Sequence, residues 1–163
     1  MDLPEKEEFE KYRQLATDIS NCIMVTYEGN QLHGRPMETA HVDMDGTIWF
    51  FTNEYSEKVD EVIEDQSVFL TYSNPSKHAY LVVSGKALLS KSRNKMEEFW
   101  SPLFKTWFPD GLDDPQMALL QVIPKQAEYW DHSNNRMIVL INMFRSLIKS
   151  IELPEADHGK FEL

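Results

Sequence analysis

The sequence predicts one domain of the α+β class, built mainly from an antiparallel β-sheet with flanking helices. Its 163 residues are a common length for a single domain, and a hydrophobic fraction of 42% can form a core without disulfides or metals. Runs of β-forming residues follow one another at short spacing, and only a few segments have helical periodicity. No repeat or linker divides the chain, which favours an antiparallel barrel over β–α–β units.

The first third of the chain predicts a helix followed by three strands. Apolar residues recur at helical spacing from Phe9 to Ile19, which indicates an amphipathic helix. The runs 22–27, 36–42 and 47–52 are rich in β-forming residues, and turn-forming residues separate them. Such short connections favour an antiparallel meander of these three strands.

The middle of the chain predicts a short helix and two further strands. Ser56 is a suitable cap for a helix with apolar residues at helical spacing. Strands are predicted over 67–73 and 80–90. Gly85 within the second strand indicates a bulge or a sharp bend, as is found where a sheet curls into a barrel.

The last part of the barrel begins after a helical pattern over 93–107, which Pro102 interrupts. Two final strands are predicted over 118–123 and 126–130, separated by Pro124. These two strands are expected to close the barrel.

The whole chain, 1–163, is predicted to be a single domain. The barrel is expected to span about 16–131. An apolar stripe then predicts a C-terminal helix over about 137–151, and a polar tail occupies 153–163.

Composition and charge exclude several classes of partner. The formal charge of −11 argues against nucleic acid and anionic membranes, because both are bound mainly through Lys and Arg. No apolar run approaches the roughly 20 residues of a membrane span. Cys22 is the only cysteine and fits a buried thiol in a reducing compartment, so a cytoplasmic location is expected. The five histidines lack the spacing of a zinc motif, so no metal site is predicted.

Two strands and the helix after them carry residues suited to binding a phosphate. If the strands lie side by side, Arg35 and Lys58 converge with the hydroxyl groups of Thr52 and Ser56. Arg offers a planar fork of donors and Lys a mobile charge, and the start of a helix adds N–H groups. Taken alone, this spacing is more often that of solvated surface charges.

The motifs in this region and beyond it resemble those of the pyridoxamine 5'-phosphate oxidase-like family, and more closely its general stress protein subgroup. The resemblance covers 16 to about 148. It rests on Arg35-Pro36-Met37, Trp49-Phe50-Phe51-Thr52, Ser56-Glu57-Lys58-Val59, the strands 67–73 and 80–85, the segment 100–109, Asp113-Asp114-Pro115, Leu119-Leu120 and Glu128-Tyr129-Trp130-Asp131.

This resemblance implies a six-stranded antiparallel split β-barrel of Greek-key topology. It also implies a homodimer that binds FMN in clefts at the subunit interface. By position in the family motifs, the FMN phosphate is assigned to Arg35, Ser56 and Lys58 with help from Thr52, and the ribityl chain or ring to Pro36, Met37 and Phe51.

The sequence departs from the related oxidases at two places. Glu57 occupies a position where their phosphate motif commonly has a second basic residue, which leaves FAD as an alternative cofactor. No counterpart of the oxidase's substrate-binding Arg and His motif follows, so a true pyridoxamine-phosphate oxidase is not predicted. Trp107 and Trp130 are candidate contacts to the isoalloxazine ring, and each also fits an aromatic core or a dimer interface.

The leading interpretation is therefore an FMN-binding protein that acts as a flavin-dependent oxidoreductase with a small-molecule reductant or substrate. One alternative is a flavin-binding or stress-response module without turnover. Another is a split barrel that binds haem or a deazaflavin in the same cleft.

Overall fold

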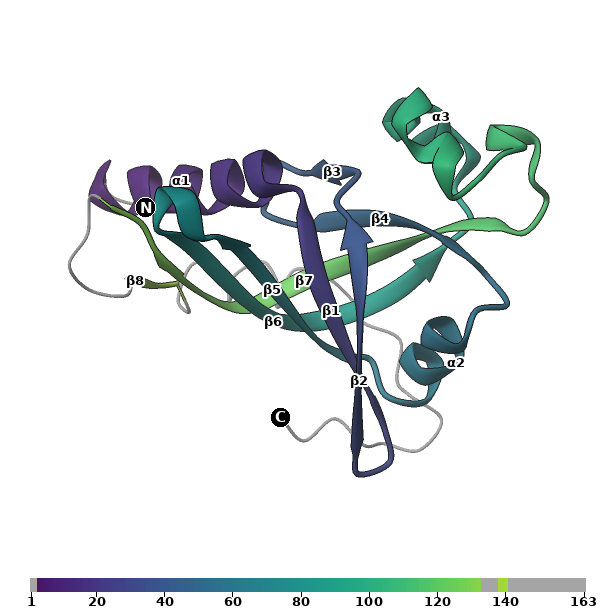
Figure 1. Cartoon of the computed structure of the whole chain (residues 1–163), viewed down its shortest axis with the longest axis horizontal. Coiled ribbons are helices and arrows are strands. Elements are labelled where there is room, and N and C mark those ends of the chain that lie inside the picture. Colours follow the sequence, from purple (N-terminus) through teal and green to yellow (C-terminus); the bar gives the residue numbers. More distant parts are fainter. Residues whose placement is uncertain (1–2, 133–137, 141–163) are drawn as a thin grey trace.

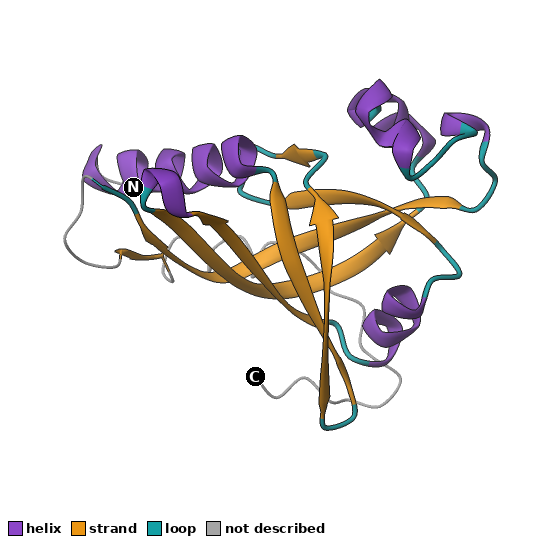
Figure 2. Ribbon diagram, viewed as in Figure 1, coloured by secondary structure: helices purple, strands orange, loops and turns teal. Residues whose placement is uncertain are grey.

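The computed structural model describes residues 3–132 and 138–140, and in these residues the fold is mainly an antiparallel sheet with three α-helices (Figures 1 and 2). The α-helices are α1 (Leu3–Ile19), α2 (Glu57–Glu64) and α3 (Arg93–Phe99), and the short 3-10 helices are η1 (Pro75–Lys77), η2 (Pro102–Thr106) and η3 (Gly111–Asp113). None of the described helices combines the length and the hydropathy that a membrane span needs.

Eight strands form one sheet in the described residues. They are β1 (Asn21–Glu28), β2 (Gln31–Glu38), β3 (His41–Val42), β4 (Ile48–Asn53), β5 (Ser67–Asn74), β6 (Ala79–Ser90), β7 (Met117–Trp130) and β8 (Ile138–Leu140). Their order is β2-β1-β5-β6-β7-β4-β3, and β8 also pairs with β7. The predicted antiparallel fold class is confirmed, and the two short strands β3 and β8 add to the six long ones.

The predicted meander of the first three strands is only partly correct, because the predicted strand 36–42 is divided in the structure between β2 and β3. β2 pairs with β1, in a hairpin that places Asn21 opposite Glu38, whereas β4 pairs with β3 and β7. β4 lies between the long strand β7 and the short edge strand β3, and its side chains are buried on both faces. The sheet curls so that β2 approaches β4 across the barrel without pairing with it (Figure 1).

Two hydrophobic clusters lie on opposite faces of β4. Ile48 and Phe50 point into the barrel core, which α1 and α2 help to cover. Trp49 and Phe51 point the other way, into a second cluster with residues of α3, η2 and β7. Because successive side chains of β4 point to opposite faces, this strand contributes both to the barrel interior and to one wall of the outer cluster.

A bulge bends the long pair of strands β6 and β7. The register shifts between Ser84 and Gly85, and Gly85 then lies opposite Pro124. The bulge predicted at Gly85 is confirmed, but Pro124 does not split the last strand, because the irregularity accommodates a residue without an N–H.

Two predicted helices differ in the structure. The pattern over 93–107 forms α3 and then η2, because Pro102 starts the second helix and Trp100 is extended. The predicted helix over 137–151 is wrong at 138–140, which pair with β7 as β8. The remainder of that range and the tail 153–163 lie outside the described residues.

Replacing Gly85 with Ala is expected to destabilise the protein by about 1–3 kcal/mol, the usual cost of overpacking. A Cβ at this position would overlap the carbonyl oxygen of Ile123 and lie 3.2 Å from Cα of Pro124, and both atoms belong to the backbone. Urea unfolding followed by circular dichroism measures the change. Ser84→Ala is the matched control, and equal stability of the two variants would contradict the close approach.

Candidate functional site

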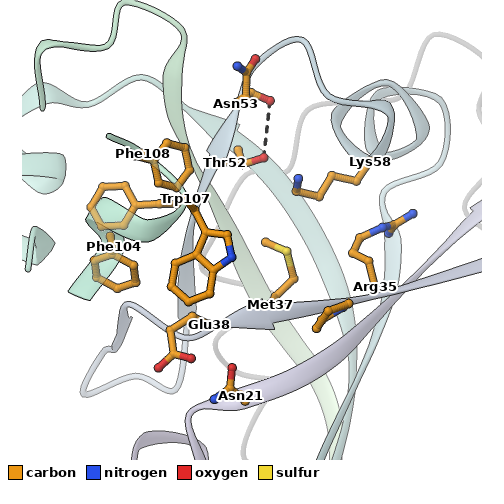
Figure 3. Close-up of a pocket in the computed structure, with 12 residues that line it drawn as sticks. Asn21, Arg35, Met37, Glu38, Thr52, Asn53, Lys58, Phe104, Trp107 and Phe108 are labelled. Carbon is orange, nitrogen blue, oxygen red and sulfur yellow. Dashed lines mark hydrogen bonds between the residues drawn. The ribbon is translucent and has the colours of Figure 1, made fainter. Parts of the chain in front are cut away.

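A pocket lies where the end of β2 approaches β4, with α2 and the segment around η2 at its sides (Figure 3). Its volume is about 320 Å³. Pockets for small ligands and cofactors commonly span roughly 300–1,000 Å³. The lining residues are Asn21, Arg35, Pro36, Met37, Glu38, Phe51, Thr52, Asn53, Lys58, Phe104, Trp107 and Phe108.

Most of the residues predicted from the sequence come together in this pocket. Its lining includes Arg35, Pro36, Met37, Phe51, Thr52, Lys58 and Trp107. Ser56 is not part of the lining, but its hydroxyl oxygen lies 3.4 Å from that of Thr52. Their roles in binding a cofactor stay predictions.

Trp130 does not join the pocket within this chain. It lies opposite Tyr80 at the end of β7, whereas the pocket adjoins the other end of that strand, where Ala118 pairs with Thr52. Eleven residues of β7 therefore lie between Ala118 and Trp130. The sequence pattern gave no register for β7, and so it did not distinguish Trp107 from Trp130.

Lys58 supplies the available positive charge of the pocket. It lies in the first turn of α2 and its amine points toward Thr52 (Figure 3). Burial, and then the nearby charge of Arg35, lower the pKa of Lys58. Lys58 forms no ion pair with any residue that the structure describes. A bound anion would therefore be a favourable partner for it.

Arg35 is held in place by a buried network that the sequence analysis missed. Its guanidinium donates to Oγ1 of Thr26 at 2.7 Å and to Oε2 of Glu61 at 3.0 Å. Thr26 also donates to Glu61, and Nδ1 of His33 lies 2.6 Å from the other carboxylate oxygen. This network fixes the direction of the Arg35 side chain, and Glu61 offsets part of its charge.

Glu61 is a charged residue on the buried side of α2, with 7% of its surface exposed. Burial raises the pKa of a carboxyl group, but the hydrogen bonds from Thr26, His33 and Arg35 together outweigh burial and lower the pKa of Glu61. One signal for this network was present in the sequence, since Thr26 takes an inward position of β1 otherwise held by apolar residues.

The same network brings together three groups able to bind a metal. Ligand atoms of Glu28, His33 and Glu61 lie within 4.8 Å of one another. Both ring nitrogens of His33 already face carboxylates, and Arg35 occupies Glu61. An adjacent guanidinium repels a metal cation, so this arrangement is better explained as a hydrogen-bonded support for Arg35.

Aromatic side chains form the apolar wall of the pocket. The Phe51 ring lies 4.9 Å from that of Phe104 and 6.2 Å from that of Phe108, measured between centroids. Trp107 stands at the mouth with 59% of its surface exposed. The pocket therefore combines a cationic end with an aromatic wall, which suits a flat apolar ring attached to a phosphate.

Replacing Glu61 with Gln is expected to lower the free energy of unfolding near neutral pH by about 1–3 kcal/mol, because Arg35 and His33 lose a buried charged acceptor. The folded-state pKa of Glu61 lies below its ordinary value of 4.5, so this stabilisation is present above about pH 4.5. It is lost as the pH falls through the lowered pKa.

Urea unfolding at about pH 6.5 and about pH 4 tests this pH dependence. The free energies of unfolding of the wild type and Glu61→Gln should differ less at the lower pH. Glu64→Gln removes an exposed carboxylate of the same helix and serves as the control. If the difference in unfolding free energy does not change with pH, the stabilising role of the ionised Glu61 would be contradicted.

Comparison with known proteins places the chain in a family. Residues 7–153 match the family described as pyridoxamine 5'-phosphate oxidase like. The chain is 29% identical to general stress protein 26 of Bacillus subtilis over 105 residues, or 63% of this chain and 73% of the relative.

Two crystal structures have a similar fold. One, from Clostridium acetobutylicum, is a protein related to general stress protein 26, with a TM-score of 0.71 and 19% identity over 87% of this chain and 97% of that one. The other is the general stress FMN/FAD binding protein of Xanthomonas citri, with a TM-score of 0.68 and 22% identity over 82% and 94% of the two chains.

The family match extends over most of the chain, and the structural similarity agrees with the antiparallel fold described above. The resemblance to this family found in the sequence motifs is thereby confirmed, and general stress proteins are among the similar proteins. The chain belongs to the pyridoxamine 5'-phosphate oxidase-like family.

Proposed function

We propose that the chain binds FMN in the pocket between β2 and β4 and uses it as a flavin-dependent oxidoreductase. The carrying observation is that Lys58, which has no ion pair within the described residues, shares one pocket with the aromatic wall around Phe51. The description of the Xanthomonas citri protein as FMN/FAD binding supports a flavin. A lysine that faces a phosphate favours FMN, whose phosphate is terminal.

Each part of the pocket has a separate task in this proposal. Lys58 and the outward donors of Arg35 bind the phosphate, and Thr52 adds a hydroxyl group. Met37 and Pro36 border the ribityl chain, while Trp107 covers one face of the isoalloxazine and limits access of water. The bound flavin supplies the hydride and electron transfer, and the protein positions it.

A flavin-binding module without turnover is the second candidate. Within the described residues the lining contains no histidine, cysteine or tyrosine side chain that would act as a general acid or base. Reduction of the bound flavin by reduced nicotinamides, followed by electron transfer to quinone and nitro acceptors, distinguishes the candidates. Turnover supports the oxidoreductase, whereas tight binding without turnover supports the module.

We also propose a homodimer in which a second chain covers the open side of the pocket. Large apolar side chains in and next to the pocket lining are exposed, since Trp107 of the lining is 59% exposed and Leu103, which precedes the lining residue Phe104 in η2, is 74% exposed. Such residues commonly mark contact surfaces when they lie together. A symmetric pair would bury them twice.

Replacing Lys58 with Ala is expected to weaken FMN binding by roughly tenfold to a hundredfold, the effect of losing one charge-assisted hydrogen bond. Riboflavin, which lacks the phosphate, should bind both proteins equally well. Flavin fluorescence titration gives both dissociation constants. Lys77→Ala, which removes an exposed lysine outside the pocket, is the matched control. Equal losses for FMN and riboflavin would refute the phosphate assignment.

Dilution is expected to release the flavin and dissociate the dimer together, because a ligand that contacts both chains stabilises only the dimer. Size-exclusion chromatography with detection at 280 and about 450 nm follows protein and flavin over a dilution series. A monomer that keeps one flavin per chain would show that the second chain is not part of the site.

A further inference from the structure

The pocket has a second polar end that the phosphate assignment does not use. Glu38 and Asn21 line it there, away from Lys58 and Arg35 (Figure 3). Arg35 and Glu38 are three residues apart on β2, a separation of roughly 10 Å along an extended strand. The pocket thus presents cations at one end, aromatic and apolar side chains along its length, and a carboxylate at the other end.

Local structure positions the Glu38 carboxylate. Ser20, which lies between α1 and β1, has a φ of 68°, a conformation that residues other than glycine rarely adopt. Its hydroxyl donates to Oε1 of Glu38, which leaves Oε2 as an acceptor. Glu38 forms no ion pair within the part of the chain that the structure describes.

Asn21 adds a complementary group beside this carboxylate. Asn21 and Glu38 are directly opposite each other in the β1–β2 register, and side chains of such a pair are neighbours on one face of the sheet. The Asn21 amide offers N–H donors, whereas ionised Glu38 is only an acceptor. A donor and an acceptor side by side are suited to an imide group, in which a carbonyl stands next to an N–H.

We propose that Glu38 and Asn21 recognise the imide edge of the isoalloxazine ring, with Glu38 accepting the hydrogen bond from N3–H and Asn21 donating to an adjacent carbonyl. This proposal rests on FMN being bound as proposed above. It assigns the second end of the pocket and makes Glu38 a specificity-determining residue, because a ring without this donor leaves Oε2 of the carboxylate without its hydrogen bond.

The test compares FMN with FMN methylated at N3, which lacks the donor but keeps the phosphate and the ring. We expect the wild type to prefer FMN by roughly tenfold to a hundredfold. Glu38→Ala should reduce this preference to within about threefold, because it removes the acceptor and leaves space for the methyl group. Glu38→Gln keeps the shape and should retain an intermediate preference through its neutral carbonyl. Fluorescence titration of each protein with each ligand measures these affinities.

Glu64→Gln removes an equal charge outside the pocket and should keep the full preference. A wild type that binds both ligands equally would overturn the assignment of Glu38. A preference that persists in Glu38→Ala would also overturn it, because the methyl group would then be excluded by shape alone. Failure of the wild type to bind FMN at all would instead reject the proposed function on which this inference depends.

Discussion

The candidate site depends on one buried carboxylate. Glu61 connects α2 to Thr26 of β1 and to His33 and Arg35 of β2, so a helix and two strands share one hydrogen-bonded group. Removing Glu61 would leave Arg35 without its charged partner in a partly buried position, which is costly. The network therefore fixes the position of α2, and with it Lys58, relative to the strand that carries the rest of the pocket.

This constraint also determines the charge of the pocket. Because Glu61 offsets Arg35, Lys58 is the pocket-lining cation that forms no ion pair within the described residues, although the whole chain carries a formal charge of −11. The opposite end has a carboxylate, and Trp107 and Met37 lie between the two ends (Figure 3). A ligand that fits this order has an anion at one end, a flat ring, and an N–H donor at the other end.

Much of the site was predictable from local sequence. The sequence motifs predicted that Arg35-Pro36-Met37, Phe51-Thr52 and Lys58 belong to one binding site. These residues do line one pocket. The reason differs from the one expected, since β2 and β4 are not neighbours in a meander and meet only because the sheet curls.

What was not predictable depends on contacts between distant segments. From the sequence alone, Glu61 is indistinguishable from the other surface charges of an amphipathic helix. Its hydrogen-bond partners lie 26 to 35 residues away in sequence. Trp130 lies away from the pocket because the other end of β7, residues 117–122, pairs with β4, and this long-range pairing is not visible in the local sequence. The apolar pattern of β8 fits a helix and a strand equally well. Its pairing with β7 makes this segment a strand.

Titration of the purified protein with FMN, followed by absorption and flavin fluorescence, tests the central claim most directly. The account predicts saturation at about one FMN per chain at micromolar concentration, with the fluorescence quenched by stacking on Trp107. No uptake of FMN at this concentration would contradict the proposed function, and would leave the family and the fold as the conclusions that stand.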